Sequence, residues 1–121
     1  MKFLAIYQNE ILGKPVSKND AFKMLRKLSG NTHEVYTGVS ILLNGSIRTF
    51  DDVTKVTFYE LSDDEINYYI EKYQPMDKAG SYGIQEWMGY VGIQKMEGDF
   101  FNVMGLPLHK LYREINEIID L

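Results

Sequence analysis

The dipeptide Asn44–Gly45 stands between two long segments in which apolar and polar residues alternate, and no other feature constrains the fold as strongly. In the first segment, alternate positions that would share one face of a strand are Val35, Thr37, Val39, Ile41 and Leu43. Asn-Gly is a preferred two-residue hairpin loop, because both residues tolerate positive φ angles. The sequence therefore predicts an antiparallel hairpin over about residues 33–59.

The returning strand of this hairpin has an irregular apolar pattern. Ile47 is out of phase with the later set of Phe50, Val56 and Phe58. A β-bulge adds one residue to a strand and shifts which side chains share a face. We therefore expect a bulge near Asp51–Asp52.

Helical patterns occur on both sides of the hairpin. Ser17 precedes a stretch with apolar residues three and four positions apart, and Gly30 follows it, as at many helix ends. Ser62 and Glu65 have the spacing of a capping box at the start of a second helix. Pro107 stands at the start of a third helix, whose apolar face would carry Leu108, Leu111, Tyr112, Ile115, Ile118 and Ile119.

The remaining segments predict short strands. Residues 2–7 form an apolar run, and residues 90–103 read as two strands around a turn at 97–99. The sum is a single domain over residues 1–121 of the α/β class with α+β character. We expect a mixed, largely antiparallel sheet with about three helices packed on it.

Composition excludes several classes of function. The chain has 121 residues, no cysteine and a formal net charge of −4. The lack of cysteine excludes disulfides and thiolate sites, which fits a cytoplasmic location. The negative net charge argues against a general nucleic-acid binder, which would need a basic face. The apolar start is too short for a signal peptide or a membrane span, so no membrane association is expected.

Two candidate residues stand close to predicted secondary structure. Lys14 stands between Gly13 and Pro15, where its charged ammonium could bind a phosphate. The same tripeptide also suits an ordinary turn with a solvated lysine. His33 could act as a general base or metal ligand, or it could cap a helix or fill a polar core position. His109 is expected on the surface.

The stretch DKAGSYGIQEW, residues 77–87, is the strongest candidate for a binding site. Asp77 could pair with Lys78 or orient it toward an anion, and two glycines allow the backbone to approach a ligand closely. Gln85 has donor and acceptor atoms, so it could read a polar edge such as that of a nucleobase. Loops held by a rigid scaffold often carry function.

Taken in order, the segments ILGKP, AFKMLRKLSGNTHEVYTGV, TKVTFYELSDDEINYYIE, PMDKAGSYGIQ and GDFFNVMGLPLHKLY resemble the Maf family of nucleoside triphosphate pyrophosphatases. The resemblance implies a Maf- and ITPase-like fold and hydrolysis between the α and β phosphates. It also implies a divalent cation (Mg²⁺ or Mn²⁺), a role in cleaning nucleotide pools and a link to septum formation. Lys14 and Lys78 would face the phosphates, Asp77 would orient Lys78, and Gln85 resembles the residue of the dTTP/UTP-preferring branch.

The chain also departs from this family's pattern. The family's SxSPRR-like phosphate motif and its ADT motif, whose Asp is the expected base or metal holder, do not occur here. Counting back from GKP places Lys2 at that Asp and Phe3 at the following Thr. The chain thus resembles the C-terminal half of the family's fold, a truncated form in which no catalytic residue and no metal ligand can be assigned.

Two hypotheses follow from this departure. Hydrolysis of dTTP or UTP should be weak unless another chain supplies the carboxylates, and the alternatives are a nucleotide-binding module without turnover or an oligomerising fragment. The strand at residues 2–7 would have an uncovered edge, and open edges invite pairing with another chain. We therefore expect a homo-oligomer, such as a dimer with strand exchange.

Overall fold

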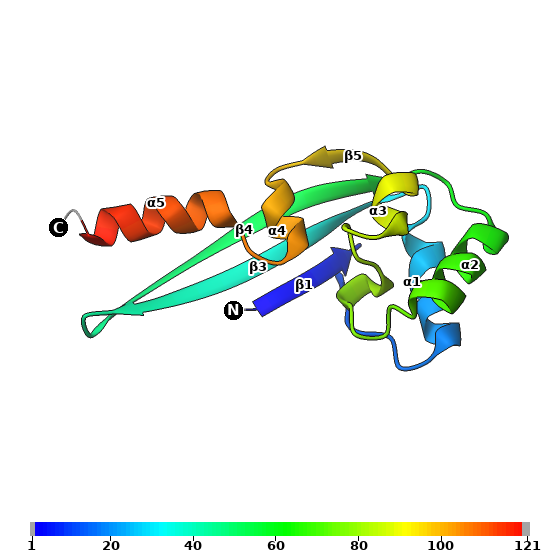
Figure 1. The fold of residues 1–121 in the computed structure, drawn as a ribbon, viewed down its shortest axis with the longest axis horizontal. Helices are drawn as coiled ribbons and strands as arrows, with labels where there is room; N and C mark the ends of the chain where they lie inside the picture. The colour runs from blue at the N-terminus through cyan, green and yellow to red at the C-terminus, as the bar shows by residue number, and fades with distance from the viewer. Residues whose placement is uncertain (1, 120–121) are drawn as a thin grey trace.

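The computed structural model describes residues 2–119, without the side chain of Lys2, and is built on one five-stranded antiparallel sheet (Figure 1). The strand order is β2-β1-β3-β4-β5. The strands are β1 (Lys2–Tyr7), β2 (Glu10–Leu12), β3 (Thr32–Leu43), β4 (Ser46–Phe58) and β5 (Ile93–Glu97). The expected fold class, a largely antiparallel sheet with about three substantial helices, is confirmed.

The hairpin of β3 and β4 forms as the Asn-Gly signal predicts. Leu43 pairs with Ser46 across a two-residue loop, in which Asn44 has a φ of 51° and Gly45 a φ of 80°. Positive φ at both central residues matches the right-handed twist of the flanking strands. The buried face alternates along β3, with Val35, Thr37 and Val39 turned inward.

The predicted bulge at Asp51–Asp52 is wrong. The β3–β4 register is continuous, with Gly38 opposite Asp51 and Thr37 opposite Asp52. Ile47 breaks the apolar phase because it lies on the outer face, where it is 74 % exposed. The irregular position is instead Thr57–Phe58, where β4 pairs with β5.

Two capped helices cover one end of the sheet. In α1 (Lys18–Leu28) the Asp20 amide donates to the Ser17 hydroxyl, and α2 (Asp63–Tyr73) has the predicted reciprocal capping box between Ser62 and Glu65. Both helices lie beside the base of the hairpin (Figure 1). Together with the sheet they bury the main core, which includes Ala5, Leu25, Leu28, Val56, Phe58, Ile66 and Met88.

Residues 87–104 depart from the expected pair of short strands. Only β5 is a strand, and it lies between two five-residue helices, α3 (Trp87–Val91) and α4 (Phe100–Met104). Asp99 caps α4 by accepting from the Phe101 amide. The buried Asn102 side chain fixes this helix to the sheet by donating to the Val35 and Asp52 carbonyls.

The distal half of the hairpin and helix α5 (Leu108–Ile119) form an arm that projects from the body (Figure 1). Arg48 pairs with Glu114 and Glu117 of α5, and the Lys110 ammonium donates to the Asp51 carbonyl. The predicted apolar face of α5 has no fully buried residue. No helix within residues 2–119 has the length and apolarity needed to cross a membrane.

Strand β1 has less open edge than expected. Its residues Ala5–Tyr7 pair with β2, so only its first half lacks a neighbour on that side within the described part of the chain. The local turn Gln8–Asn9, in which both residues have positive φ, folds β2 back along β1. The expectation of a wholly uncovered edge is therefore wrong for the second half of β1.

Candidate functional site

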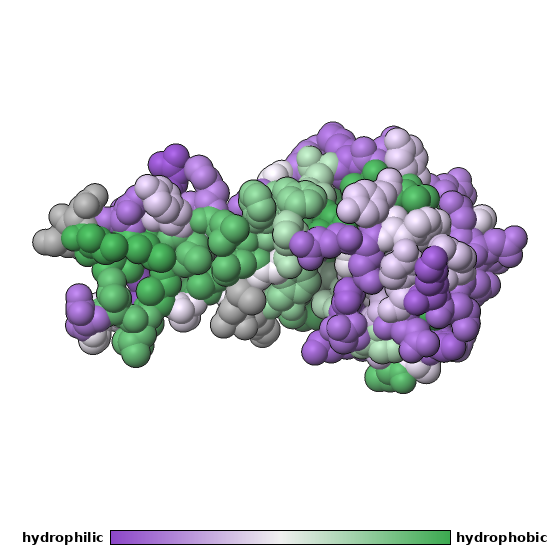
Figure 2. Space-filling model, in the orientation of Figure 1, coloured by the Kyte–Doolittle hydropathy of each residue, from purple (hydrophilic) through white to green (hydrophobic). Residues whose placement is uncertain are grey.

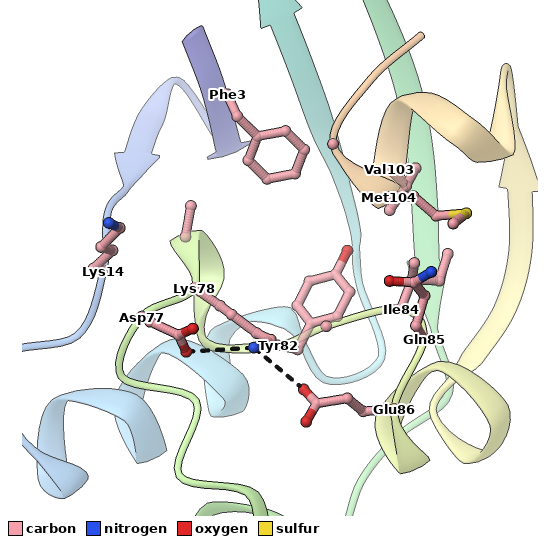
Figure 3. Close-up of a pocket in the computed structure, with 13 residues that line it drawn as sticks. Phe3, Lys14, Asp77, Lys78, Tyr82, Ile84, Gln85, Glu86, Val103 and Met104 are labelled. Carbon is pink, nitrogen blue, oxygen red and sulfur yellow. Dashed lines mark hydrogen bonds and ion pairs between the residues drawn. The ribbon is translucent and has the colours of Figure 1, made fainter. Parts of the chain in front are cut away.

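A cavity of about 510 Å³ lies between β1, the polar loop after α2, and α4 (Figure 3). Lys14, Asp77, Lys78 and Gln85 all line it. These are the four residues predicted to bind a substrate, and the structure brings them together. Lys14 and Gln85 lie at opposite sides of the cavity, and the Lys78 ammonium lies between them (Figure 3).

Backbone contacts hold the lysines near one another. Lys14 follows β2, and the Gly80 amide donates to the Gly13 carbonyl at 3.1 Å, which joins the two loops. Gly80 has a φ of 74°, and a Cβ there would lie 3.1 Å from the Ala5 Cβ. Glycine is therefore required where the short helix η1 (Ala79–Ser81) crosses β1.

Lys78 lies between two carboxylates. Its Nζ is 3.3 Å from Oδ1 of Asp77 and 3.8 Å from Oε1 of Glu86 (Figure 3). Hydrogen bonding to its own backbone amide and to the Lys78 ammonium lowers the pKa of Asp77, and the charge of Lys14 adds to this effect. The cavity thus contains two cations, Lys14 and Lys78, and an anionic ligand could replace the carboxylates that now pair with Lys78.

Glu86 is held by a buried tyrosine. The Tyr69 hydroxyl donates to Oε1 of Glu86 at 2.8 Å and accepts from the Gly83 amide at 3.0 Å. Burial raises the pKa of Tyr69, so the hydroxyl stays protonated and remains a donor. Gly83 leaves space for this arrangement, since a Cβ there would lie 2.7 Å from both Glu86 Oε1 and Lys78 Cε.

His33 lies behind the cavity rather than in its lining. It is 1 % exposed, and its Nε2 lies 2.7 Å from the hydroxyl of Tyr82, which does line the cavity. Burial lowers the pKa of His33 from 6.5 to about 4. Of the alternatives for His33, the polar core position is confirmed, and His109 is exposed and accepts from Arg113 as expected of a surface residue.

Several cavity residues were not singled out from the sequence. Glu86 was adjacent to Gln85 in the candidate stretch, and its charge beside a glycine-rich loop was a signal that could have identified it. Tyr82 lay in the same stretch. Of the apolar lining residues, Ile84 lies in the same stretch, whereas Phe3, Val103 and Met104 come from distant segments and have no local signal.

The described residues contain no cluster typical of a metal site with three or more protein ligands. Within residues 2–119, no three His, Asp or Glu side chains are grouped to hold an ion. The two carboxylates of the cavity both face the Lys78 ammonium, a competing cation. Lys2 is the residue aligned with the Asp of the family's ADT motif. Its side chain lies outside the described residues, so the structure does not test this alignment.

The family model for Maf-like proteins matches residues 3–118. The chain belongs to the Maf family. A relative from Phocaeicola vulgatus is 56% identical over 108 residues, and the match covers 89% of this chain and 56% of the relative. A relative from Porphyromonas gingivalis is 55% identical over 114 residues, covering 94% of this chain and 57% of the relative.

Both relatives are named dTTP/UTP pyrophosphatase, as is one from Cytophaga hutchinsonii that is 51% identical over 117 residues. This Maf chain spans a little more than half the length of these curated relatives. Its cavity has the chemistry to hold an elongated ligand, with an anionic end at Lys14 and Lys78 and a polar edge at Gln85.

Proposed function

We propose that this chain binds a pyrimidine nucleoside triphosphate, dTTP or UTP, and takes part in its hydrolysis to the monophosphate and pyrophosphate. The observation that carries the proposal is the shared cavity of Lys14, Lys78 and Gln85 in a chain with relatives named dTTP/UTP pyrophosphatase. Lys14 and Lys78 would neutralise the triphosphate, and the Gln85 amide would pair with the base. The absence of cysteine agrees with a cytoplasmic location, which we propose for this role in nucleotide pools.

Hydrolysis needs a water that attacks the α-phosphorus while the bond to the bridging oxygen breaks. We propose that this chain by itself performs that step slowly. The lowered pKa of Asp77 makes its carboxylate a weak base. The divalent cation remains a prediction, because the described residues contain no cluster of three His, Asp or Glu side chains that would identify its ligands. The alternative function, binding without turnover, is favoured by the pairing of both cavity carboxylates with Lys78.

A binding experiment tests the nucleotide site. We expect calorimetric titration to show dTTP and UTP binding more tightly than GTP. The Lys78→Met variant should weaken dTTP binding by about tenfold or more, because it removes a charged hydrogen-bond donor to phosphate. Lys95→Met is the matched control, since Lys95 is exposed on β5 and pairs with Glu97 away from the cavity. Equal affinity of the two variants for dTTP would count against the proposal.

Pyrophosphate release then separates the two functions. The pure chain is incubated with dTTP or UTP and with Mg²⁺ or Mn²⁺. Binding with slow release supports a hydrolase that lacks part of its catalytic groups, whereas binding without any release supports the non-catalytic alternative. Rapid turnover by the pure chain would contradict the expectation of weak hydrolysis.

We also propose that the chain forms a homodimer through the apolar face of α5. Leu108, Tyr112 and Ile119 are 47%, 66% and 65% exposed on this short helix. The charges of α5 are segregated, with Lys110 and Arg113 toward its start and Glu114 and Glu117 toward its end. A two-fold interface would place this apolar face against the same face of a second copy, while Glu114 and Glu117 keep their pairing with Arg48 of their own chain.

A further inference from the structure

The loop Gly83–Glu86 carries Gln85. One side chain from α2, that of Tyr69, forms hydrogen bonds with both ends of this loop. The Tyr69 hydroxyl accepts from the Gly83 amide and donates to the Glu86 carboxylate, at 3.0 Å and 2.8 Å. The Glu86 amide also donates to the Gly83 carbonyl at 3.2 Å. Tyr69 therefore bonds to the loop on both sides of Gln85 without lining the cavity itself.

Tyr69 is rigidly placed for this role. It is fully buried, and its ring stacks on Tyr73 at 5.2 Å and on Trp87 at 6.2 Å between centroids. It lies in α2, whose start is fixed by the Ser62–Glu65 capping box. A side chain with this packing has one accessible rotamer, so the position of its hydroxyl is set before any ligand binds.

The loop is also seated closely on α3. A Cβ at Gly89 would lie 1.7 Å from the Ile84 carbonyl oxygen, so glycine is required for this approach. The Ile84 side chain is buried and lines the cavity, and the neighbouring Gln85 lines it with an exposed side chain (Figure 3). Helix α3 packs against one side of the loop, and the Tyr69 hydroxyl forms hydrogen bonds with its first residue, Gly83, and its last, Glu86.

We infer that Tyr69 is a positioning residue that sets the orientation of Gln85 for recognition of the nucleobase. The inference rests on the proposed nucleotide-binding function. Without the hydroxyl, the Gly83 amide and the Glu86 carboxylate lose their common partner, and the loop gains conformations in which Gln85 points elsewhere. The lysines proposed to face the phosphates have contacts of their own, those of Gly13 with Gly80 and of Asp77 with Lys78, and Lys78 also pairs with Glu86.

The test compares a ligand that has a base with one that lacks it. Dissociation constants for dTTP and for inorganic tripolyphosphate are measured by calorimetry, and their ratio reports the contribution of the nucleoside. In Tyr69→Phe, we expect the affinity for dTTP relative to tripolyphosphate to fall about fivefold, the loss typical of one hydrogen bond. Effects on Lys78 through Glu86 cancel in this ratio, because both ligands present phosphates. Tyr73→Phe is the control, since it lies in the same aromatic stack and should leave the ratio unchanged.

A double-mutant cycle makes the inference specific to Gln85. The Gln85→Ala variant removes the group that would read the base, and Tyr69→Phe in that background should then have no further effect on the ratio. An unchanged ratio in Tyr69→Phe, or an equal loss with and without Gln85, would overturn the inference. A wild-type chain that binds dTTP no better than tripolyphosphate would instead contradict the proposed base recognition, so the two failures are distinguishable.

Discussion

His33 supports the cavity wall from behind, and its charge state matters for folding. Its Nε2 contacts the Tyr82 hydroxyl, while its Nδ1 has no hydrogen-bond partner among the described residues. A protonated imidazole must donate from both nitrogens. Protonation would therefore place a buried charge beside Phe58 and Tyr82 with one donor unsatisfied. The neutral form is the one compatible with this packing.

The stability of the fold should consequently depend on pH through His33. The pKa of His33 is 6.5 in the unfolded chain and about 4 when folded, so the unfolded chain binds more protons between these values. The contribution is fully present above pH 6.5 and is lost as pH falls toward about 4, by up to roughly 3 kcal/mol. Urea unfolding of wild type, His33→Gln and His109→Gln across this range measures it. His33→Gln should show a smaller decrease, and His109→Gln, an exposed control, should follow wild type; equal decreases in all three would refute the assignment.

Among the elements, those with a local chemical signal were predictable from sequence and those fixed by distant contacts were not. The hairpin follows from Asn44–Gly45, and α2 follows from the Ser62–Glu65 pair. Helix α4 has only five residues, too few for a periodic pattern, and it is fixed by Asn102 donating to carbonyls some fifty or more positions earlier in the chain. No local pattern contains that information.

The candidate site divides in the same way. Lys14, Asp77, Lys78 and Gln85 stand in short polar motifs and were found, whereas Tyr69 has the spacing of an ordinary core residue in an amphipathic helix. Its hydroxyl acquires a role only because the loop of Gly83 and Glu86 folds back onto α2. The polar residues of a binding motif can be recognised in the sequence. The residues that orient them can be identified only from the folded structure, because they come from other segments.

The hairpin loop makes a direct prediction for element stability. Gly45 has a φ of 80°, so Gly45→Ala should lower the free energy of unfolding by about 1 kcal/mol, because an L-residue is strained there. Gly38→Ala is the matched control. Gly38 lies within β3, and an added Cβ would make only an ordinary 3.8 Å contact with the Tyr36 ring. Chemical denaturation measures both, and an equal loss in the two variants would contradict the conformational explanation.

The whole molecule has a compact body and a projecting arm, and these two parts differ in surface character. The body contains the cavity and a mostly polar exterior, whereas apolar residues run continuously along the arm (Figure 2). Exposed apolar residues of the arm lie on both of its parts, Leu42 and Ile47 on the outer face of the hairpin and Leu108, Tyr112 and Ile119 on α5. Contiguous exposed apolar surface of this kind is uncommon on monomers. The arm is therefore the surface through which the proposed dimer would form.

The proposed dimer can be tested through α5 without disturbing the core. We expect light scattering coupled to size-exclusion chromatography to give the mass of a dimer for the wild-type chain. The double variant Tyr112→Glu and Ile119→Glu should give the mass of a monomer, because it places charges on the interface while both sites are more than half exposed in the single chain. Tyr90→Glu, at an 81% exposed aromatic outside α5, is the control and should remain dimeric. A wild-type chain that elutes as a uniform monomer would refute the dimer, and a dimer that survives the double substitution would place the interface away from α5.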